Sequence, residues 1–354
     1  MQKTKIEWAE SVWNPTRGCS RVNEACRNCF AERIAARFSK ACGFPHNGNI
    51  PETFHSYAEN TSAGPRWTGK VELTYHKLLE PLRRRKPQVI FVNSMSDLWH
   101  EKLNRIDRFR IYGIMAAAHW HTFIVLTKRP KVRLDEFATA RFRAEVIQSS
   151  YEFTRDYLKG PIRGADYPEP NWPLPNVWEG VSVHDEQSAN DMITTLCDTP
   201  VAKRVISYEP ALGPIRLGQW ITKLDWVIAG GESGSGARPA NPEWFRSIRG
   251  ECLDTGVPFF FKQWGAWVPP ERLSDSTADH GDVGLFDDTP CRIERSRGRN
   301  AEAAGRCLAK DLPSSRIYRF SDGQRMIRVG KRNAGRLLDG SEWVQMPKFT
   351  EKHA

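Results

Sequence analysis

Residues 89–97 read Val-Ile-Phe-Val-Asn-Ser-Met-Ser-Asp, an apolar run that ends in polar residues. Its β-branched and aromatic side chains predict a buried strand over 89–92. Up to eight such runs recur at spacings that leave room for a helix, which is typical of a βα-repeat with a parallel sheet. They are the segment entering Arg17-Gly18-Cys19 and residues 70–73, 89–92, 122–126, 177–181, 204–207, 226–229 and 259–261.

Helices are predicted between several of these strands, for example over residues 106–118 and over 242–255, where Asn241 serves as N-cap and Pro242 as first residue. The fold class is therefore α/β. We expect a (β/α) barrel, complete or partial, over residues 1–267, because 354 residues suffice for a barrel of about 250 residues plus appendages. A doubly wound open sheet would have the same alternation.

Other stretches break the repeat. Residues 133–175 are predicted to be an insertion that ends in a proline-rich run. Residues 268–305 are rich in Asp, Ser, Gly and Arg, which predicts a mobile loop. Residues 306–354 are predicted to form a small basic C-terminal extension with a β-ribbon that turns at Asp339-Gly340.

The charge is uneven along the chain. The formal net charge is +10, and residues 291–354 carry fifteen bases against seven acids. Such a region favours polyanions, although a solvated surface has the same composition. No apolar run approaches the ~20 residues of a membrane span, and the N-terminus lacks a secretory signal, so we expect a cytoplasmic protein without membrane association.

Cys19, Cys26 and Cys29 crowd into eleven positions, which indicates a metal site in a reducing compartment. Residues 30–38 follow with Phe30, Ile34 and Phe38 on one helical stripe. Three thiolates without a fourth would leave one iron of a four-iron cluster open to an external ligand. A closed zinc site completed by His46 or another cysteine is the alternative. The other five cysteines are isolated, and we expect them to be packed or surface residues.

Polar or glycine residues follow most of the predicted strands, where a barrel has its catalytic mouth. We predict that they bind a cofactor, with solvated charges, buried ion pairs or a simple glycine turn as alternatives. Trp99, Trp264 and Trp267 could stack on a base or adenine. Histidines 100, 119 and 121 are expected to be packed or surface residues. The predicted cofactor-binding residues are Asn93, Ser94, Asp97, Lys128, Arg129, Ser182, Glu209, Gly230, Gly231, Glu232 and Lys262.

Several motifs resemble a phage-associated radical-SAM-like family with a three-cysteine motif. They cover most of residues 4–267. Their spans are Thr4 to Trp8, Asn14-Pro15, Gly18-Cys19, Cys26 to Arg33, Phe91 to Leu98, Leu126 to Pro130, Asn176 to Ser182, Gly230 to Gly234 and Phe260 to Gly265, with a weaker likeness at Gly335 to Gly340.

The resemblance implies that the (β/α) barrel, complete or partial, is of radical-SAM type. It also implies a 4Fe-4S cluster on the three cysteines, S-adenosylmethionine as cofactor and an external electron donor. The reduced cluster would cleave the cofactor and yield a deoxyadenosyl radical. The sequence departs from the common radical-SAM pattern in its six-residue first gap and in Asn28, which stands where an aromatic residue is usual.

The basic region of residues 291–354 indicates a nucleic acid or nucleotide as the expected substrate. Two alternatives remain at this point. One is a non-catalytic nucleic-acid-binding protein stapled by zinc or an iron-sulfur cluster, and the other is an iron-sulfur protein that binds the cofactor as a sensor or scaffold.

Overall fold

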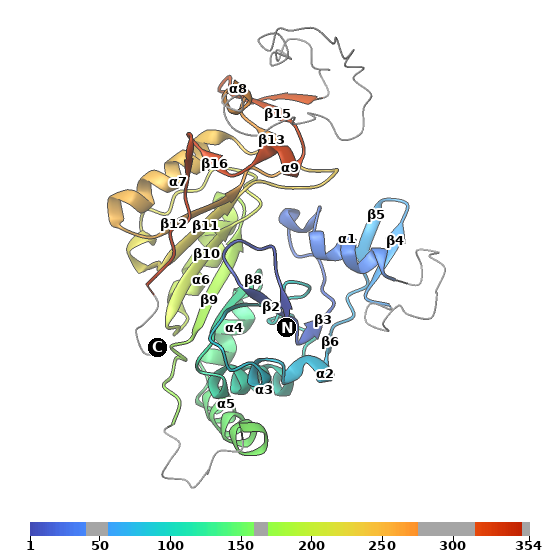
Figure 1. Cartoon of the computed structure of the whole chain (residues 1–354), viewed down its shortest axis with the longest axis vertical. Coiled ribbons are helices and arrows are strands. Elements are labelled where there is room, and N and C mark those ends of the chain that lie inside the picture. The colour runs from blue at the N-terminus through green and yellow to red at the C-terminus, as the bar shows by residue number, and fades with distance from the viewer. Residues whose placement is uncertain (40–55, 159–168, 275–315, 349–354) are drawn as a thin grey trace, which may run out of the picture.

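The computed structural model describes residues 1–39, 56–158, 169–274 and 316–348. Its centre is a parallel sheet curled into a half-barrel (Figure 1), which confirms the α/β class with a partial barrel. Within the described residues, seven strands run parallel and one short strand, β1, pairs antiparallel at the edge beside β2. In spatial order the strands are β1 (Gln2–Lys3), β2 (Ser11–Trp13), β7 (Val89–Val92), β8 (Thr122–Thr127), β9 (Val177–Val183), β10 (Lys203–Tyr208), β11 (Trp226–Gly230) and β12 (Phe259–Gln263).

Helices connect the strands and shield the convex face of the sheet (Figure 1). The predicted helices over 106–118 and 242–255 are both present, and Asn241 caps the second by accepting a 2.9 Å hydrogen bond from the Glu243 amide. The helices with more than four residues are α1 (Phe30–Arg37), α3 (Arg105–Ala117), α4 (Pro130–Phe137), α5 (Ala140–Phe153), α6 (Glu186–Asp198) and α7 (Pro242–Thr255). The short ones are α2 (Tyr75–Leu78), α8 (Glu271–Ser274) and α9 (Lys331–Ala334).

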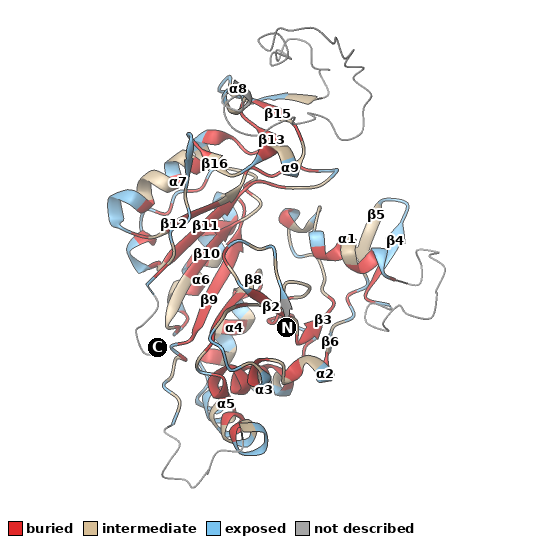
Figure 2. Cartoon of the chain, viewed as in Figure 1, coloured by how far each residue is buried: buried red, intermediate tan, exposed pale blue. Residues whose placement is uncertain are grey.

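Successive residues of each strand alternate between two cores. Even-numbered residues of β8, β9, β11 and β12 face the concave side, where Trp8 of the N-terminal segment packs against them. The sheet strands are buried almost throughout (Figure 2). Apolar side chains therefore fill the half-barrel away from the carboxyl ends of its strands. Polar residues occupy those carboxyl ends. The concave core consists of Trp8, Ile124, Trp178, Val205, Trp226, Ile228 and Phe260.

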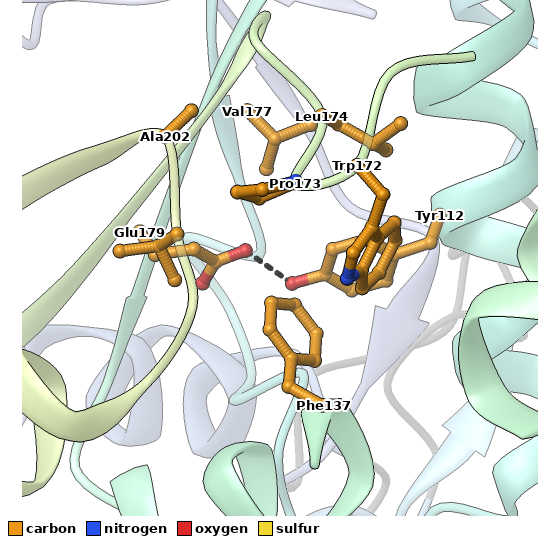
Figure 3. A pocket seen from close by; sticks show the side chains of 9 residues that line it. Tyr112, Phe137, Trp172, Pro173, Leu174, Val177, Glu179 and Ala202 are labelled. Carbon is orange, nitrogen blue, oxygen red and sulfur yellow. Dashed lines mark hydrogen bonds between the residues drawn. The ribbon is translucent and has the colours of Figure 1, made fainter. Parts of the chain in front are cut away.

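The convex face of β9 carries a buried ion pair. Glu179 Oε2 accepts a 3.0 Å hydrogen bond from Arg133 Nη1, and Glu179 Oε1 accepts one from the Tyr112 hydroxyl. Both polar groups come from helices, α4 and α3. Beside them lies a small cavity, lined by Phe137 and Trp172 among others, with room for about one water molecule (Figure 3).

The C-terminal region is packed onto the half-barrel. Residues 343–345 run along the outer edge of β12, where the Phe261 amide donates to Trp343 O and the Gln345 amide donates to Phe259 O. We name this segment, residues 343–345, the edge strap. It covers hydrogen-bonding groups that an open sheet edge would expose. The remaining small strands are β13 (Trp267–Val268), β14 (Ile317–Arg319), β15 (Arg325–Arg328), β16 (Leu337–Leu338) and β17 (Ser341–Glu342).

The predicted ribbon is present as β16–β17, with its turn at Asp339-Gly340. A second hairpin, β14–β15, extends the sheet that starts at β13. Met326, Ile327 and Leu338 are nearly inaccessible and belong to the main core, so residues 316–348 form part of the domain rather than a separate extension.

Two local predictions need correction. Residues 72–73 form β6, which pairs with β3 (Thr16–Arg17) outside the main sheet. The helix over 30–37 is present, but Phe30 and Phe38 are exposed; α1 instead buries Ala31, Glu32, Ala35 and Ala36. The reason is its neighbour, the hairpin of β4 (Ala58–Thr61) and β5 (Gly64–Trp67), whose close approach requires small side chains.

The predicted insertion 133–175 continues the repeat, because α4 and α5 occupy it up to Phe153. Residues 275–305 of the predicted mobile loop, Cys42, Cys291, Cys307 and His46 lie outside the described residues. Nowhere in the described part of the chain is there a helix with the length and apolarity to span a membrane.

Candidate functional site

The three cysteines lie in one loop over the carboxyl ends of the sheet. β2 and β3 lead to Cys19, and Gly18 adopts a φ of 85° where a Cβ would lie 1.8 Å from Lys70 O. Cys26 ends a 3₁₀ turn, Glu24–Cys26, and Cys29 is the N-cap residue of α1. We call residues 19–29 the cysteine loop.

Arg129, directly after β8, fastens one end of the cysteine loop. Its guanidinium donates to Ser20 O at 2.9 Å and lies 3.7 Å from Cys19 Sγ. It also donates to Asp97 Oδ2 at 3.1 Å. Asp97 in turn accepts hydrogen bonds from the Trp99 and Lys128 amides and the Thr127 hydroxyl. Both predicted site residues are thus fully engaged in holding the loop.

His100 supports the same end of the loop. Its Nδ1 accepts a hydrogen bond from the Lys102 amide at 3.1 Å, which places the ring proton on Nε2. Nε2 lies 2.8 Å from the Ser20 hydroxyl, to which it donates. Burial lowers the pKa of His100, and Arg129 lowers it further, which favours this neutral form. The expectation of a packed histidine is confirmed, with an added role in positioning Ser20.

Glu232, after β11, fastens the other end. Its carboxylate accepts from Asn28 Nδ2 at 3.0 Å and from Arg238 Nη2 at 2.7 Å, and Arg238 Nη1 reaches Glu24 at 2.9 Å. Burial would raise the pKa of Glu232, but the hydrogen bonds from Arg238 and Asn28 outweigh burial and lower it. Gly236 touches Asn28 so closely that a Cβ would lie 2.8 Å from Asn28 Oδ1.

The three thiols are free and electrostatically coupled. Burial raises the pKa of Cys19 to about 12 and also raises that of Cys29, with each neighbouring thiolate adding to the effect. Arg129 acts on Cys19 and Lys128 on Cys29 in the opposite direction, and Arg21 interacts with both Cys26 and Cys29. Among the described residues, no three His, Cys, Asp or Glu side chains already form a group that could hold a metal ion.

Four other predicted residues lie on the concave side at the strand ends. Lys262 Nζ forms a 2.8 Å ion pair with Glu209. Ser182 is next on the concave face after Trp178 and Gly180, and Lys128, the first residue after β8, follows Leu126 on the same face. The side chains of Lys128 and Ser182 make no hydrogen bond to any other described residue. They are the predicted groups best placed to contact a ligand.

The remaining predicted residues serve the local structure. Asn93 has a φ of 60° and its Oδ1 accepts from the Thr16 amide, while the Ser94 hydroxyl donates to Asn14 Oδ1. A Cβ at Gly231 would lie 2.0 Å from Trp264 O, and one at Gly230 would lie 3.0 Å from Glu209 Oε2. The glycines permit close packing of the loops after β11 and β12.

The predicted stacking role of three tryptophans is wrong. Trp99 and Trp264 are 0% and 1% exposed, and Trp267 is 8% exposed. The indole of Trp99 packs among Tyr112, Phe137 and Phe142, so no base could reach its face. A tryptophan next to a strand end is compatible with either a core or a surface position, which is why the sequence did not distinguish them.

Sequence reasoning missed His184 and Asp185. His184 follows β9 on the concave face, one step beyond Ser182, and is 6% exposed. Asp185 is the N-cap of α6 in a capping box with Ser188. The signal was present as His-Asp-x-x-Ser directly after a strand, because an Asp with Ser three residues later predicts a helix start and fixes the histidine before it.

A model of a protein family described as "Protein of unknown function (DUF5131)" matches residues 3–347. No curated protein and no solved structure matches the chain significantly. With a match that spans nearly its whole length, the chain belongs to the DUF5131 family.

Proposed function

We propose that the chain is a radical S-adenosylmethionine enzyme that holds a 4Fe-4S cluster on Cys19, Cys26 and Cys29. The observation that supports this most is the fastening of one three-cysteine loop to the carboxyl ends of β8 and β11, through Arg129 and Glu232. Catalytic groups of parallel α/β barrels lie at that end.

The donor set suits such a cluster. Three thiols and no nearby fourth cysteine among the described residues would leave one iron open. The raised pKa of Cys19 and of Cys29 means that their thiolates need a cation, which an iron ion provides by binding them. Because no described group is preformed for metal, binding would draw the thiols closer together.

When bound, the reduced cluster supplies the electron that cleaves S-adenosylmethionine, and an external electron donor must deliver it. The residues of the chain have simpler tasks. Arg129 and Lys128 offset the negative charge of the thiolates. Asp97 and His100 keep Arg129 and Ser20 in place. The concave core below the mouth, which includes Trp8 and Trp178, excludes water from the reaction.

The substrate we propose is a nucleic acid or nucleotide. Arg319, Arg325, Lys331 and Arg332 are exposed on the described C-terminal region. Arg328 of the same hairpin contacts Gly234 O and Ser235 O, which places the hairpin beside the loop after β11. Phosphates bound there would lie next to the cysteine loop.

The decisive experiment is anaerobic reconstitution followed by iron and sulfide analysis, with electron spin resonance in the presence and absence of S-adenosylmethionine. Cys19→Ser, Cys26→Ser and Cys29→Ser should each lose most of the iron. Cys197→Ser, in α6, is the matched control and should retain it. Production of 5'-deoxyadenosine with a strong reductant completes the test. One zinc per chain without iron, or full iron in a single Ser variant, would contradict the proposal.

The substrate class is tested by oligonucleotide binding over a salt series. Deleting the C-terminal region is unsuitable, because that region supplies core residues and the edge strap. Arg319→Gln combined with Arg325→Gln should instead weaken binding and reduce the salt slope by about two. Arg141→Gln, an exposed arginine on α5, is the control. Unchanged affinity and slope in the double variant would leave the basic surface without a binding role.

A further inference from the structure

A run of basic residues lies at the amino ends of the strands, opposite the cysteine loop. Residues 83–86, between Pro81 and Pro87, read Arg-Arg-Arg-Lys, and we name them the basic run. The run leads into β7, and the Gln88 carbonyl just after it accepts a 3.0 Å hydrogen bond from the Thr122 amide at the start of β8. Figure 1 shows α2, which precedes the run, at the other end of the molecule from β15.

The exposed cations of the basic run have no acidic partners. Arg83, Arg85 and Lys86 are exposed, and none of them forms an ion pair with a residue that the structure describes. The carboxylates closest to the run are already engaged, because Glu80 pairs with the amino terminus at 2.6 Å and Glu10 accepts from the first amide of β7. A surface that serves only solubility usually mixes both signs of charge. This one offers its positive charge to an external anion.

The backbone of the basic run is fixed by its neighbours. Arg84 Nη2 donates to Met1 O at 2.6 Å, and Arg84 O accepts from Trp120 Nε1 at 2.8 Å. The Arg85 guanidinium lies 5.2 Å from the centre of the Trp120 ring, a cation–π contact that orients it. A fixed backbone lowers the entropy that binding would cost. The cations are therefore preorganised around an anchored centre.

The size of the basic run suits a nucleic-acid backbone. Four residues span at most about 14 Å, and the phosphates of one strand follow each other about every 3.4 Å along a duplex. The three exposed cations can therefore reach successive phosphates. Trp120 is half-buried and also contacts the rings of both flanking histidines, so it anchors Arg85 instead of stacking on an unpaired base. This favours a duplex over a single strand.

We propose that Arg83, Arg85 and Lys86 bind the phosphate backbone of double-stranded nucleic acid, without reading its bases. A duplex held at the amino ends of the strands leaves the cysteine loop uncovered, so this contact holds the protein on nucleic acid and does not present a reacting group. The inference goes beyond the proposed function. It needs neither the cluster nor S-adenosylmethionine, and its residues differ from the substrate surface proposed around Arg319 and Arg325.

The test measures the fluorescence anisotropy of a labelled short DNA duplex with the full chain, between about 50 and 200 mM salt. Arg83→Gln, Arg85→Gln and Lys86→Gln combined should weaken binding about ten-fold or more and reduce the salt slope by about three, because three phosphate contacts are lost. Arg83→Lys combined with Arg85→Lys keeps the charge and should keep most of the slope.

The matched control removes the same charge from three exposed cations on α4 and α5 that each have a carboxylate partner. It combines Lys131→Gln, Arg141→Gln and Arg143→Gln. Affinity and slope should stay close to those of wild type. An equal loss in this control would mean that net charge alone governs binding, and the inference would be overturned. Tighter binding of wild type to the single strand, to polyglutamate or to anionic vesicles would also overturn it, because the partner would then be of another class.

Comparison with Arg319→Gln combined with Arg325→Gln separates the inference from the proposed substrate surface. If only the basic-run variant loses duplex binding, the inference stands and the substrate surface fails. If only the hairpin variant loses it, the substrate surface stands and the inference is overturned. Losses in both support both surfaces. A wild-type chain that binds no duplex at low salt overturns the inference, whereas iron content and 5'-deoxyadenosine formation test the proposed chemistry separately.

Discussion

The two faces of β9 use polar residues in opposite ways. On the convex face, Glu179 is enclosed by Arg133 and Tyr112, all three nearly inaccessible, and its carboxylate oxygens are both bonded. On the concave face, Ser182 and His184 also lie within the fold, yet they have hydrogen-bonding atoms left over. Burial alone therefore does not distinguish structure from function. Pairing of charges does, because Glu179 and Arg133 form a buried ion pair, even though Arg133 Nε and Nη2 lack hydrogen-bond partners, whereas Lys128 on the concave side forms no ion pair with any described residue.

The largest effect should come from breaking the enclosed cluster. Glu179→Ala leaves the Arg133 charge buried without its partner, which should cost about 3–5 kcal/mol of the free energy of unfolding. Urea denaturation measures it. The control is Glu179→Leu combined with Arg133→Met, which removes both charges and should recover much of the loss. Equal losses in the single and the double variant would mean that volume, not charge, governs this face.

A smaller loss is expected for Asp97→Asn. An amide cannot accept four hydrogen bonds or balance Arg129, so about 2–3 kcal/mol of stability should be lost. The same variant should lower the iron content after reconstitution, because Arg129 would no longer hold Ser20 and Cys19. If Asp97→Asn loses stability but retains full iron, Asp97 stabilises the fold, as Glu179 does, and does not position the cysteine loop.

Acid should destabilise the protein through His121, which lies on neither face of β9. Burial lowers the pKa of His121, whose Nε2 donates to Pro81 O and Arg84 O. Because the folded-state pKa lies below the unfolded value of about 6.5, stability is present above that value and is lost as pH falls through the window below it. His121→Gln, which keeps a donor but cannot titrate, should reduce the pH dependence of the unfolding midpoint. An unchanged pH profile would exclude His121 as a source.

The smallest effect on stability is expected for Ser182→Ala. Its hydroxyl has no partner among the described residues, so the free energy of unfolding should change by no more than about 0.5 kcal/mol. Thermal denaturation checks this, and Thr127→Val, which removes a hydroxyl that donates to Asp97, serves as the contrasting variant. A destabilisation by Ser182→Ala as large as that of Thr127→Val would remove the distinction between the two faces.

The sequence predicted strands β7 to β12 well because most of them are continuous apolar runs, and it placed Lys128, Ser182, Glu209 and Lys262 at their carboxyl ends. It could not predict that Asp97, Arg129 and Glu232 would be engaged in fastening the cysteine loop, since their partners lie up to about two hundred residues away along the chain. The exposure of Phe30 depends likewise on the β4–β5 hairpin, whose register no local pattern determines.

The edge strap has a consequence for biosynthesis. The outer edge of β12 has no hydrogen-bond partners from residues 343–345 until that segment has been synthesised. This happens about eighty residues after β12 itself has been made. During that interval the nascent sheet presents an apolar Phe259-Phe260-Phe261 edge that another chain could join. A ribosome that pauses within the intervening stretch would prolong this exposure, so the yield of soluble protein should depend on how quickly translation proceeds from residue 264 to residue 345.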